Sequence, residues 1–405
     1  MKRIQLLSGL GSIVVMCAVM SCGKEKIAAL KAASSGNSKT TQARSTTSAY
    51  WNYAQQTHNF IVGNILTSYN SYRGNTTTEA NSAYEWYNTS QIYADAAMVL
   101  NGDSRYASYM NNTYNWMSHM WDFGSSIGGY FSAANLDGSG AGGDKYVDDC
   151  AVTALAYLDA YNVTTGATQA NYLSSAEACA NWMMNCGLWT SAYGGGFYQR
   201  TGTGAVKPTQ TNGLAMQVFL KLYQLTGQTY YHDWAISIKN WLESAMYDSA
   251  SGLYIWEIDA NGVKQTAKFT YDNAIMVEAD LLYSQIMGDN TYTTKAQNLG
   301  SAMNTTLWNS AHHVYIFNTT DLRVNPAWCV WGSQAMVRLY ERDGNTAWLD
   351  YAQQNIDFIN TNLRDATSSG YHTFCDLNGG SLDTRFEGVD QAWMEREQVL
   401  LSNYR

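Results

Sequence analysis

Residues 212–241 read NGLAMQVFLKLYQLTGQTYYHDWAISIKNW and contain one complete unit of a pattern that recurs along the chain. A helical pattern of apolar residues precedes Gly227, and a second helical pattern runs through Tyr231 to Trp241. Glycine readily adopts the left-handed backbone conformation that ends a helix. The stretch therefore predicts two helices joined by a turn.

Comparable units are centred on five glycines that lie about 60 residues apart, namely Gly102, Gly166, Gly227, Gly288 and Gly344. Each glycine is predicted to end one helix and to precede another. The first set of helices is predicted to begin near Asn88, Asp148, Asn212, Asp272, Trp328 and Asp390, and the second near Ser45, Asp103, Thr168, Gln228, Asp289 and Asn345. Six hairpins predict an all-α fold, the (α/α)6 barrel, with an open α-solenoid as the alternative.

The first set of helices has few charged residues and carries apolar residues at helical spacing, such as Ala151, Leu155 and Leu158. This set is therefore predicted to form the inner ring. Long loops precede these helices, and each contains a short aromatic run that predicts a small β-strand. The runs are residues 128–131, 195–198, 252–256, 314–317 and 370–374. All of these loops fall at one end of the barrel, which is therefore the candidate active face.

The N-terminus has the pattern of a bacterial lipoprotein signal. Lys2 and Arg3 precede an apolar run, and a serine stands before Cys22. We expect a signal peptide at 1–21, acylation of Cys22, a flexible tether at 22–44 and a catalytic domain at 45–405. The protein is then exported and lipid-anchored at the cell envelope, at the outer membrane. An ordinary cleaved signal with an incidental cysteine is the alternative.

Composition excludes several classes of partner and cofactor. The net charge of -9 with 14% charged residues argues against nucleic-acid binding. Gly138–Gly143 fits G-x-G-x-x-G, but no apolar strand precedes it, so we expect no dinucleotide. No Cys/His spacing typical of a metal site is present, and five cysteines beyond Cys22 are predicted to be free thiols. We expect a monomer without cofactor or metal.

The inner helices begin at the loop-bearing end, so the polar residues at their starts should meet at the barrel mouth. Asp and Asn at such positions are also ordinary N-caps. Asp148 and Asp149 differ because a cap needs only one carboxylate. Glycoside hydrolysis needs two, one of them with a raised pKa. The pair is thus either a catalytic pair or a charged cap.

The stretch Tyr146-Val-Asp-Asp-Cys-Ala-Val-Thr-Ala-Leu-Ala-Tyr-Leu-Asp-Ala-Tyr161 resembles the signature of glycoside hydrolase family 76, the endo-α-1,6-mannanases. Residues 194–198, 207–213 and 269–274 are similar to later motifs of that family. The resemblance implies a retaining hydrolase that cleaves an α-1,6-mannan-type polysaccharide, with Asp148 as nucleophile and Asp149 as acid/base.

Further side chains are predicted to bind the polysaccharide. The amides and carboxyls at inner-helix starts could hold sugar hydroxyls, and loop aromatics could stack on pyranose rings. These candidates are Asn88, Tyr198, Asn212, Trp256, Asp272, Trp328 and Asp390. Trp331 is predicted to pack in the core, whereas Asp383, Glu387 and Glu395 are predicted to be solvated. Another sugar enzyme on this scaffold, such as an epimerase or transglycosylase, and a non-catalytic glycan-binding lipoprotein are the alternatives.

Overall fold

The computed structural model describes residues 48–405. The predicted signal peptide, tether and acylation site at Cys22 lie outside this range. The inner helices are α3 (Glu85–Leu100), α5 (Val147–Asn162), α7 (Thr209–Thr226), α9 (Thr270–Met287), α11 (Pro326–Asp343) and α13 (Gly388–Leu401). The outer helices are α2 (Ala49–Asn64), α4 (Ala107–Met117), α6 (Gly166–Asn185), α8 (Thr229–Trp241), α10 (Thr291–Thr306) and α12 (Thr346–Asn362). Each begins within four residues of its predicted start.

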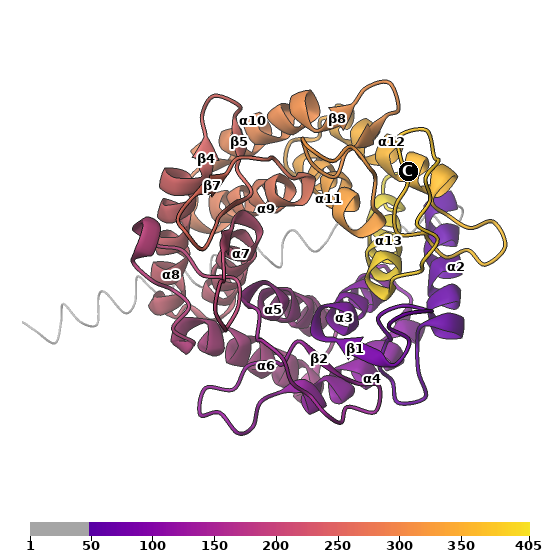
Figure 1. The fold of residues 1–405 in the computed structure, drawn as a ribbon, viewed down its shortest axis with the longest axis horizontal. Helices are drawn as coiled ribbons and strands as arrows, with labels where there is room; N and C mark the ends of the chain where they lie inside the picture. Colours follow the sequence, from indigo (N-terminus) through magenta and orange to yellow (C-terminus); the bar gives the residue numbers. More distant parts are fainter. Residues whose placement is uncertain (1–47) are drawn as a thin grey trace, which may run out of the picture.

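The helices form a closed ring of two layers (Figure 1). Each inner helix packs against the next, and α13 packs against α3. The helix α2 packs on α13, so the beginning and the end of the described chain make up one hairpin. Ser48 Oγ donates a hydrogen bond to the carbonyl of Arg405 at 2.6 Å across this junction. The (α/α)6 barrel is confirmed, and the open solenoid is excluded.

Glycine is the C-cap of three of the six inner helices, and the prediction for Gly166 is wrong. Gly227, Gly288 and Gly344 are left-handed C-caps, each with φ of 73°. Gly166 instead begins α6, because α5 already ends at Asn162 and a short connection follows it. Val163 occupies the C-cap of α5, and Gly166, with φ of 64°, is the first residue of α6.

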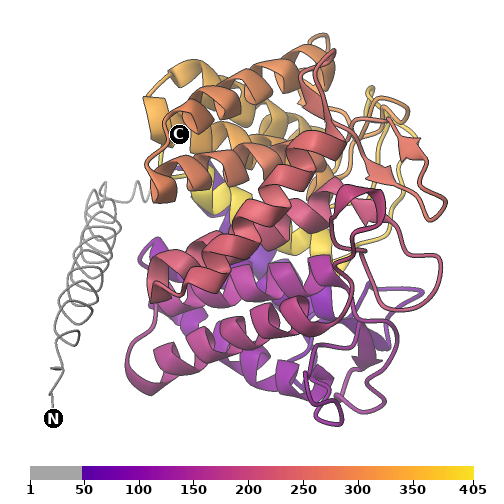
Figure 2. The ribbon, with the colours of Figure 1, turned by 90° about the vertical axis from the view of Figure 1, so that its left-hand side faces the viewer.

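The long loops and their strands gather at one end of the barrel, and the C-terminal residue lies at the other (Figure 2). The strands are β1 (Ser82–Tyr84), β2 (Ala133–Asn135), β3 (Lys207–Pro208), β4 (Tyr247–Asp248), β5 (Leu253–Tyr254), β6 (Glu257–Ile258), β7 (Lys264–Gln265), β8 (Trp308–Asn309) and β9 (Val314–Tyr315). Two predicted aromatic runs form strands, β5 and β9. The other three form isolated bridges, Trp121 to Tyr130, Trp189 to Phe197, and, for the run 370–374, Arg364 to Tyr371 and Phe374 to Asp383.

The core and the thiols agree with the sequence predictions. Trp331 is 4% exposed and packs on Trp393 with ring centroids 4.2 Å apart. The five cysteines of the described range are free, and all but Cys186 are buried. Among residues 48–405, no helix has both the length and the apolar character that crossing a membrane requires.

Candidate active site

The first residues of the six inner helices surround the barrel mouth (Figure 1), and the predicted site residues occupy three equivalent positions there. Asp148 is the second residue of its helix. Third in their helices are Asp149, Asp272, Trp328 and Asp390. Fourth in theirs are Asn88 and Asn212. Since each position has a fixed direction on an α-helix, side chains at one position can be compared around the ring.

Asp148 is buried and strongly hydrogen-bonded. Its Oδ2 accepts hydrogen bonds from Gln199 Nε2 at 2.8 Å, from Gln210 Nε2 at 2.9 Å and from Thr211 Oγ1 at 3.3 Å. Its Oδ1 accepts one from the backbone N–H of Asp149 at 3.2 Å. Burial raises the pKa of Asp148, and the bonds from Gln199 and Gln210 oppose that rise. These donors favour the ionised form, and they hold the carboxylate in one orientation.

Asp149 has a different environment. Its carboxylate accepts no hydrogen bond from any residue between 48 and 405, and the side chain is partly exposed. Burial and the neighbouring charge of Asp148 raise the pKa of Asp149 well above the usual range. Two adjacent carboxyl groups thus have unequal proton affinities, because one has donors and the other has none.

Glu85, the first residue of α3, is a third carboxyl group near this pair. It is fully buried, and Thr153 Oγ1 donates to its Oε1 at 2.9 Å. Burial and the charge of Asp149 raise the pKa of Glu85 well above its usual value. Sequence analysis missed Glu85 because a glutamate that opens a helix is ordinary.

Asp272 and Asp390 connect neighbouring inner helices. Asp272 Oδ1 accepts the backbone N–H of Gln210, the second residue of α7, at 2.9 Å. Asp390 Oδ1 accepts the backbone N–H of Ala327, the second residue of α11, at 3.2 Å. Each carboxyl therefore caps the helix beside it. Asp149 occupies the equivalent position but caps nothing within the described chain, so it is free of this structural task.

Asn88 and Asn212 hold loop backbone in place. Asn88 accepts the N–H of Tyr72 at 2.7 Å and donates to the carbonyls of Tyr72 and Tyr84. Asn212 accepts the N–H of Phe197 at 2.7 Å and donates to the carbonyls of Phe197 and Pro208.

Both asparagines are fully buried, so the structure favours a structural role over the predicted contact with sugar. Two other inner helices make equivalent hydrogen bonds to loop backbone. Asn273 accepts the N–H of Tyr254, and Gln391 accepts the N–H of Tyr371.

A row of packed aromatic rings, here called the aromatic wall, lies beside the carboxyl groups and contains Trp86, Trp328 and Tyr271. The Tyr271 ring packs on Trp328 with centroids 4.6 Å apart, and Trp328 packs on Trp86 at 4.7 Å. The Trp256 ring packs on Phe269 with centroids 5.0 Å apart, and Phe269 packs on Tyr271 at 5.2 Å. Trp86, Trp256 and Trp328 keep partly exposed faces, as a sugar-stacking surface requires.

The predicted stacking residue Tyr198 is also partly exposed, and its ring centroid lies 4.5 Å from Lys207 Nζ. Sequence analysis missed Gln199, Gln210, Tyr271 and Glu257 at the mouth, because only the fold brings them together.

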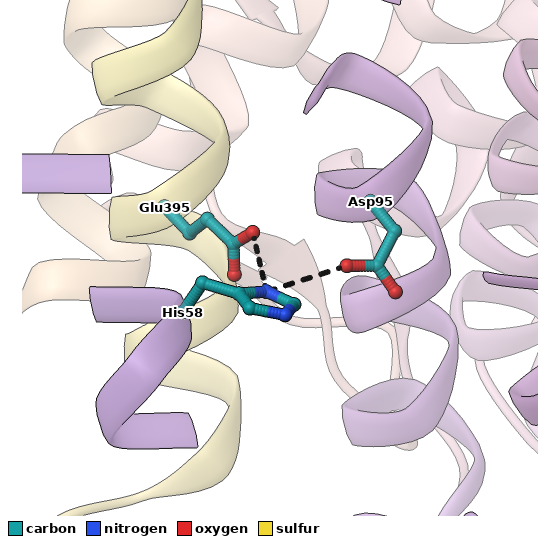
Figure 3. Close-up of side chains that lie close together, drawn as sticks. All are labelled: His58, Asp95 and Glu395. Carbon is teal, nitrogen blue, oxygen red and sulfur yellow. Dashed lines mark hydrogen bonds and ion pairs between the residues drawn. The ribbon is translucent and has the colours of Figure 1, made fainter. Parts of the chain in front are cut away.

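A separate polar cluster joins α2, α3 and α13 (Figure 3). His58 Nδ1 lies 3.0 Å from Glu395 Oε1 and 3.6 Å from Asp95 Oδ1, and the ligand atoms of all three residues lie within 4.8 Å of one another. Gln91 Nε2 donates to both carboxylates.

Burial opposes the protonation of His58, but Glu395 and Asp95 outweigh it and raise its pKa to about 9. Protonated His58 lies between two carboxylates, so we interpret the cluster as an ion pair that joins α2, α3 and α13.

The prediction that Glu387 and Glu395 are solvated is wrong. Glu395 is fully buried against His58, and Glu387 is 7% exposed and accepts hydrogen bonds from Asn75 and Tyr87. Contacts between the two ends of the chain bury both residues, which local sequence cannot reveal.

Two hollows lie outside the ring, away from the carboxyl groups. One, of about 560 Å³, lies between α6 and α8 and is lined by Asn181, Tyr230 and Trp234 among others. The other, of about 330 Å³, lies between α4 and α6 and is lined by Tyr114 and Phe123 among others. Neither contains a residue of the mouth.

Solved structures with the same fold include several sugar enzymes. An alpha-mannanase of family 76 from Bacteroides thetaiotaomicron has a TM-score of 0.78 and 20% identity, over 89% of this chain and 97% of that one. An inactive α-1,6-mannanase from Salegentibacter sp. HEL1_6, with two consecutive aspartates changed to asparagine and α-1,6-mannotriose bound, has a TM-score of 0.70 and 17% identity, over 87% and 99%. Cellobiose 2-epimerase from Bacillus thermoamylovorans has a TM-score of 0.71 and 13% identity, over 86% and 98%. At these identities the likeness establishes the fold alone.

Sequence comparison identifies the family. No curated protein sequence matches the chain significantly. Residues 52–320 match the sequence pattern of the family described as "Glycosyl hydrolase family 76". The matched range includes both aspartates and most of the barrel mouth. The chain therefore belongs to glycosyl hydrolase family 76 and is a glycoside hydrolase.

Proposed function

We propose that this glycoside hydrolase cleaves α-1,6-linked mannan with retention of configuration, through Asp148 as nucleophile and Asp149 as general acid/base. The observation that carries the proposal is the contrast between the two neighbours. Asp148 receives four hydrogen bonds, whereas Asp149 receives none from the described chain and is not used as a cap.

The contrast suits a double displacement. A nucleophile must be ionised and correctly oriented, and the donors on Asp148 supply both conditions. The first step forms an ester between Asp148 and the anomeric carbon while Asp149 protonates the departing glycosidic oxygen. Asp149 then takes a proton from water, which attacks the anomeric carbon and releases Asp148. The acid needs a raised pKa, which burial and Asp148 give to Asp149.

The choice of mannan rests on relatives. Family membership and the shared fold of two mannanases support it, and the inactive mannanase with two changed neighbouring aspartates supports the catalytic pair. Trp256, Trp328 and Tyr198 are proposed to stack on sugar rings. Asp272 and Asp390 act through the helices that they cap.

An epimerase is the second candidate because a cellobiose 2-epimerase and a D-mannose isomerase share the fold. Epimerisation needs an acid/base pair, most often histidines, at the mouth. None of the six histidines stands at the start of an inner helix. A glycan-binding protein without activity would need the aromatic wall but would not need an uncapped Asp149.

One experiment separates these functions. Wild type and the Asp148→Asn and Asp149→Asn variants are incubated with α-1,6-mannan, and the release of reducing ends is followed. Asp233→Asn, on the exposed surface of α8, is the matched control. We expect release by wild type and by the control only. Binding without release by any protein contradicts hydrolysis, and interconversion of free sugars without release supports the epimerase.

We also propose that Cys22 is acylated and anchors the enzyme at the outer membrane, with residues 22–44 as the tether. The basic start, the apolar run and the serine before Cys22 support this. Metabolic labelling with an alkynyl fatty acid should mark the wild type and not Cys22→Ala. Equal labelling of both proteins, or a wild type found only in soluble fractions, contradicts the anchor.

A further inference from the structure

Glu257 lies at the barrel mouth and takes no part in the proposed cleavage of the glycosidic bond. It begins β6, where it pairs with Pro208 of β3 on one side and Gln265 of β7 on the other. The strand β3 leads directly into α7, and the N–H of Thr209 donates to the carbonyl of Trp256 at 2.9 Å. Glu257 is therefore fixed beside the helix start that carries Gln210.

The carboxylate of Glu257 lacks any partner within residues 48–405. No hydrogen bond or ion pair reaches it, although the residue is only 9% exposed. Asp272 and Asp390 each have one carboxyl oxygen sealed from solvent, whereas neither oxygen of Glu257 is sealed. A mostly buried carboxylate with open oxygens is costly unless something donates to it. The arrangement therefore suits a group that receives hydrogen bonds from a ligand.

The surroundings of Glu257 indicate where that ligand lies. Glu257 pairs with Pro208, and Gln210, two residues further along, donates to Asp148 Oδ2 at 2.9 Å, so Glu257 and Asp148 both lie near the start of α7. The Trp256 ring packs on Phe269 with centroids 5.0 Å apart, which fixes the indole beside the start of α9. A sugar ring on Trp256 would then lie beside the start of α7, where Pro208 pairs with Glu257 and Gln210 holds Asp148.

No cation on the paired strands neutralises Glu257. Lys207 of β3 donates to the carbonyls of Ala192 and Gly195, and Lys264 of β7 donates to the carbonyl of Ala245. The titratable groups that face Glu257 are acidic or phenolic, namely Asp259, Asp272 and Tyr271. Burial and the Asp259 charge raise the pKa of Glu257 to about 7.

We propose that Glu257 is a substrate-binding residue that accepts hydrogen bonds from hydroxyl groups of a neutral glycan chain lying on Trp256 beside the catalytic aspartates. This inference rests on the proposed mannanase function and names a residue that sets affinity and does not take part in bond cleavage. A carboxylate that accepts from hydroxyls binds more strongly than a neutral carboxyl, so binding promotes loss of the Glu257 proton. Affinity therefore rises with pH through 7.

The test measures binding without turnover. Isothermal titration with α-1,6-mannotriose is run on Asp149→Asn and on Asp149→Asn/Glu257→Gln at pH 6, 7 and 8. We expect the second protein to bind about 10-fold more weakly at pH 8 and to lose most of the increase in affinity between pH 6 and 8. In enzymes with Asp149 intact, Glu257→Gln should raise KM about 10-fold with kcat nearly unchanged.

Controls separate this inference from folding and from the proposed function. Glu177→Gln, on the outer helix α6, should leave binding and turnover unchanged. Glu257→Asp keeps the charge and tests the same site should the glutamine variant unfold; it should retain the pH dependence with weaker binding. If wild type cleaves mannan and Glu257→Gln binds as tightly as its parent at every pH, the inference alone fails. If wild type neither binds nor cleaves mannan, the proposed function fails and the inference with it.

Discussion

The side-chain amide of Gln210 donates to Asp148 Oδ2 at 2.9 Å, while the backbone N–H of the same residue donates to Asp272 Oδ1 at the same distance. Gln210 thus connects the proposed nucleophile on α5 with a carboxyl on α9. The position of Asp148 depends on how α7 is capped, so three consecutive inner helices determine the geometry of one carboxylate.

Replacement of Gln210 by alanine should weaken the nucleophile. Loss of the donor raises the pKa of Asp148, because the hydrogen bond stabilises its ionised form. Activity requires ionised Asp148 and is lost as pH falls through its pKa, so the acid limb of the kcat/KM profile should move to higher pH. We expect about a 10-fold lower kcat/KM on the acid side. Gln224→Ala, on the same helix, is the control, and an unchanged acid limb contradicts the role of Gln210.

Replacement of Asp149 by asparagine should remove general acid catalysis. We expect kcat on mannan to fall by about 10²- to 10⁴-fold. A mannoside with an aryl leaving group of low pKa needs little protonation, so formation of the glycosyl-enzyme from it should fall far less. Burst kinetics with such a substrate give the rate of that step. Equal losses on both substrates would contradict the assignment of the acid.

Replacement of Asn212 by alanine should destabilise the fold. The amide makes three hydrogen bonds to buried backbone groups of the 197–208 segment, and those groups would lose their partner. The expected loss in the free energy of unfolding is about 3 kcal/mol. It appears as a lower denaturant midpoint of unfolding. Asn181→Ala, at an exposed position of α6, should change the midpoint little. Equal midpoints for the two variants would exclude the structural role.

The cluster at His58 should make stability depend on pH at the alkaline side. The pKa of His58 is about 9 in the fold against 6.5 for the free side chain. Its contribution is therefore fully present below pH 6.5 and is lost as pH rises through 9, by about 3 kcal/mol. The difference in unfolding free energy between wild type and His58→Gln should shrink over that range. A difference that stays constant from pH 6 to 10 contradicts the protonated state of His58.

The sequence predicted the architecture well because its signals are local. Glycines near the helix ends and apolar stripes recur along the chain, so the helix starts, the inner ring and the loop-bearing end could be identified. Closure of the ring was predicted, but the side-chain contacts between α2 and α13 were not, because they join the ends of the described chain. For the same reason His58 and Glu395, which are 337 positions apart, could not be recognised as partners.

The site was predicted less completely. The two adjacent carboxyl groups identified Asp148 and Asp149. Residue type alone could not show whether Asn88 and Asn212 bind sugar or hold loop backbone. It also could not show whether Asp272 and Asp390 bind sugar or cap a neighbouring helix. Those roles depend on which backbone groups lie opposite. Glu257 carried no sequence signal, since an acidic residue in a short loop strand is common. Its environment comes from β3, β7 and α9, which only folding brings together.

The most direct test of the central claim is to trap the covalent intermediate. Asp149→Asn is incubated with an α-1,6-mannobiosyl fluoride that carries fluorine at C2 of the reacting sugar, and the labelled peptide is identified by mass spectrometry. The two-carboxylate mechanism predicts a glycosyl ester on Asp148, with release of fluoride equal to the enzyme present. An ester on any other residue, or steady fluoride release with inversion at the anomeric carbon and no adduct, would contradict it.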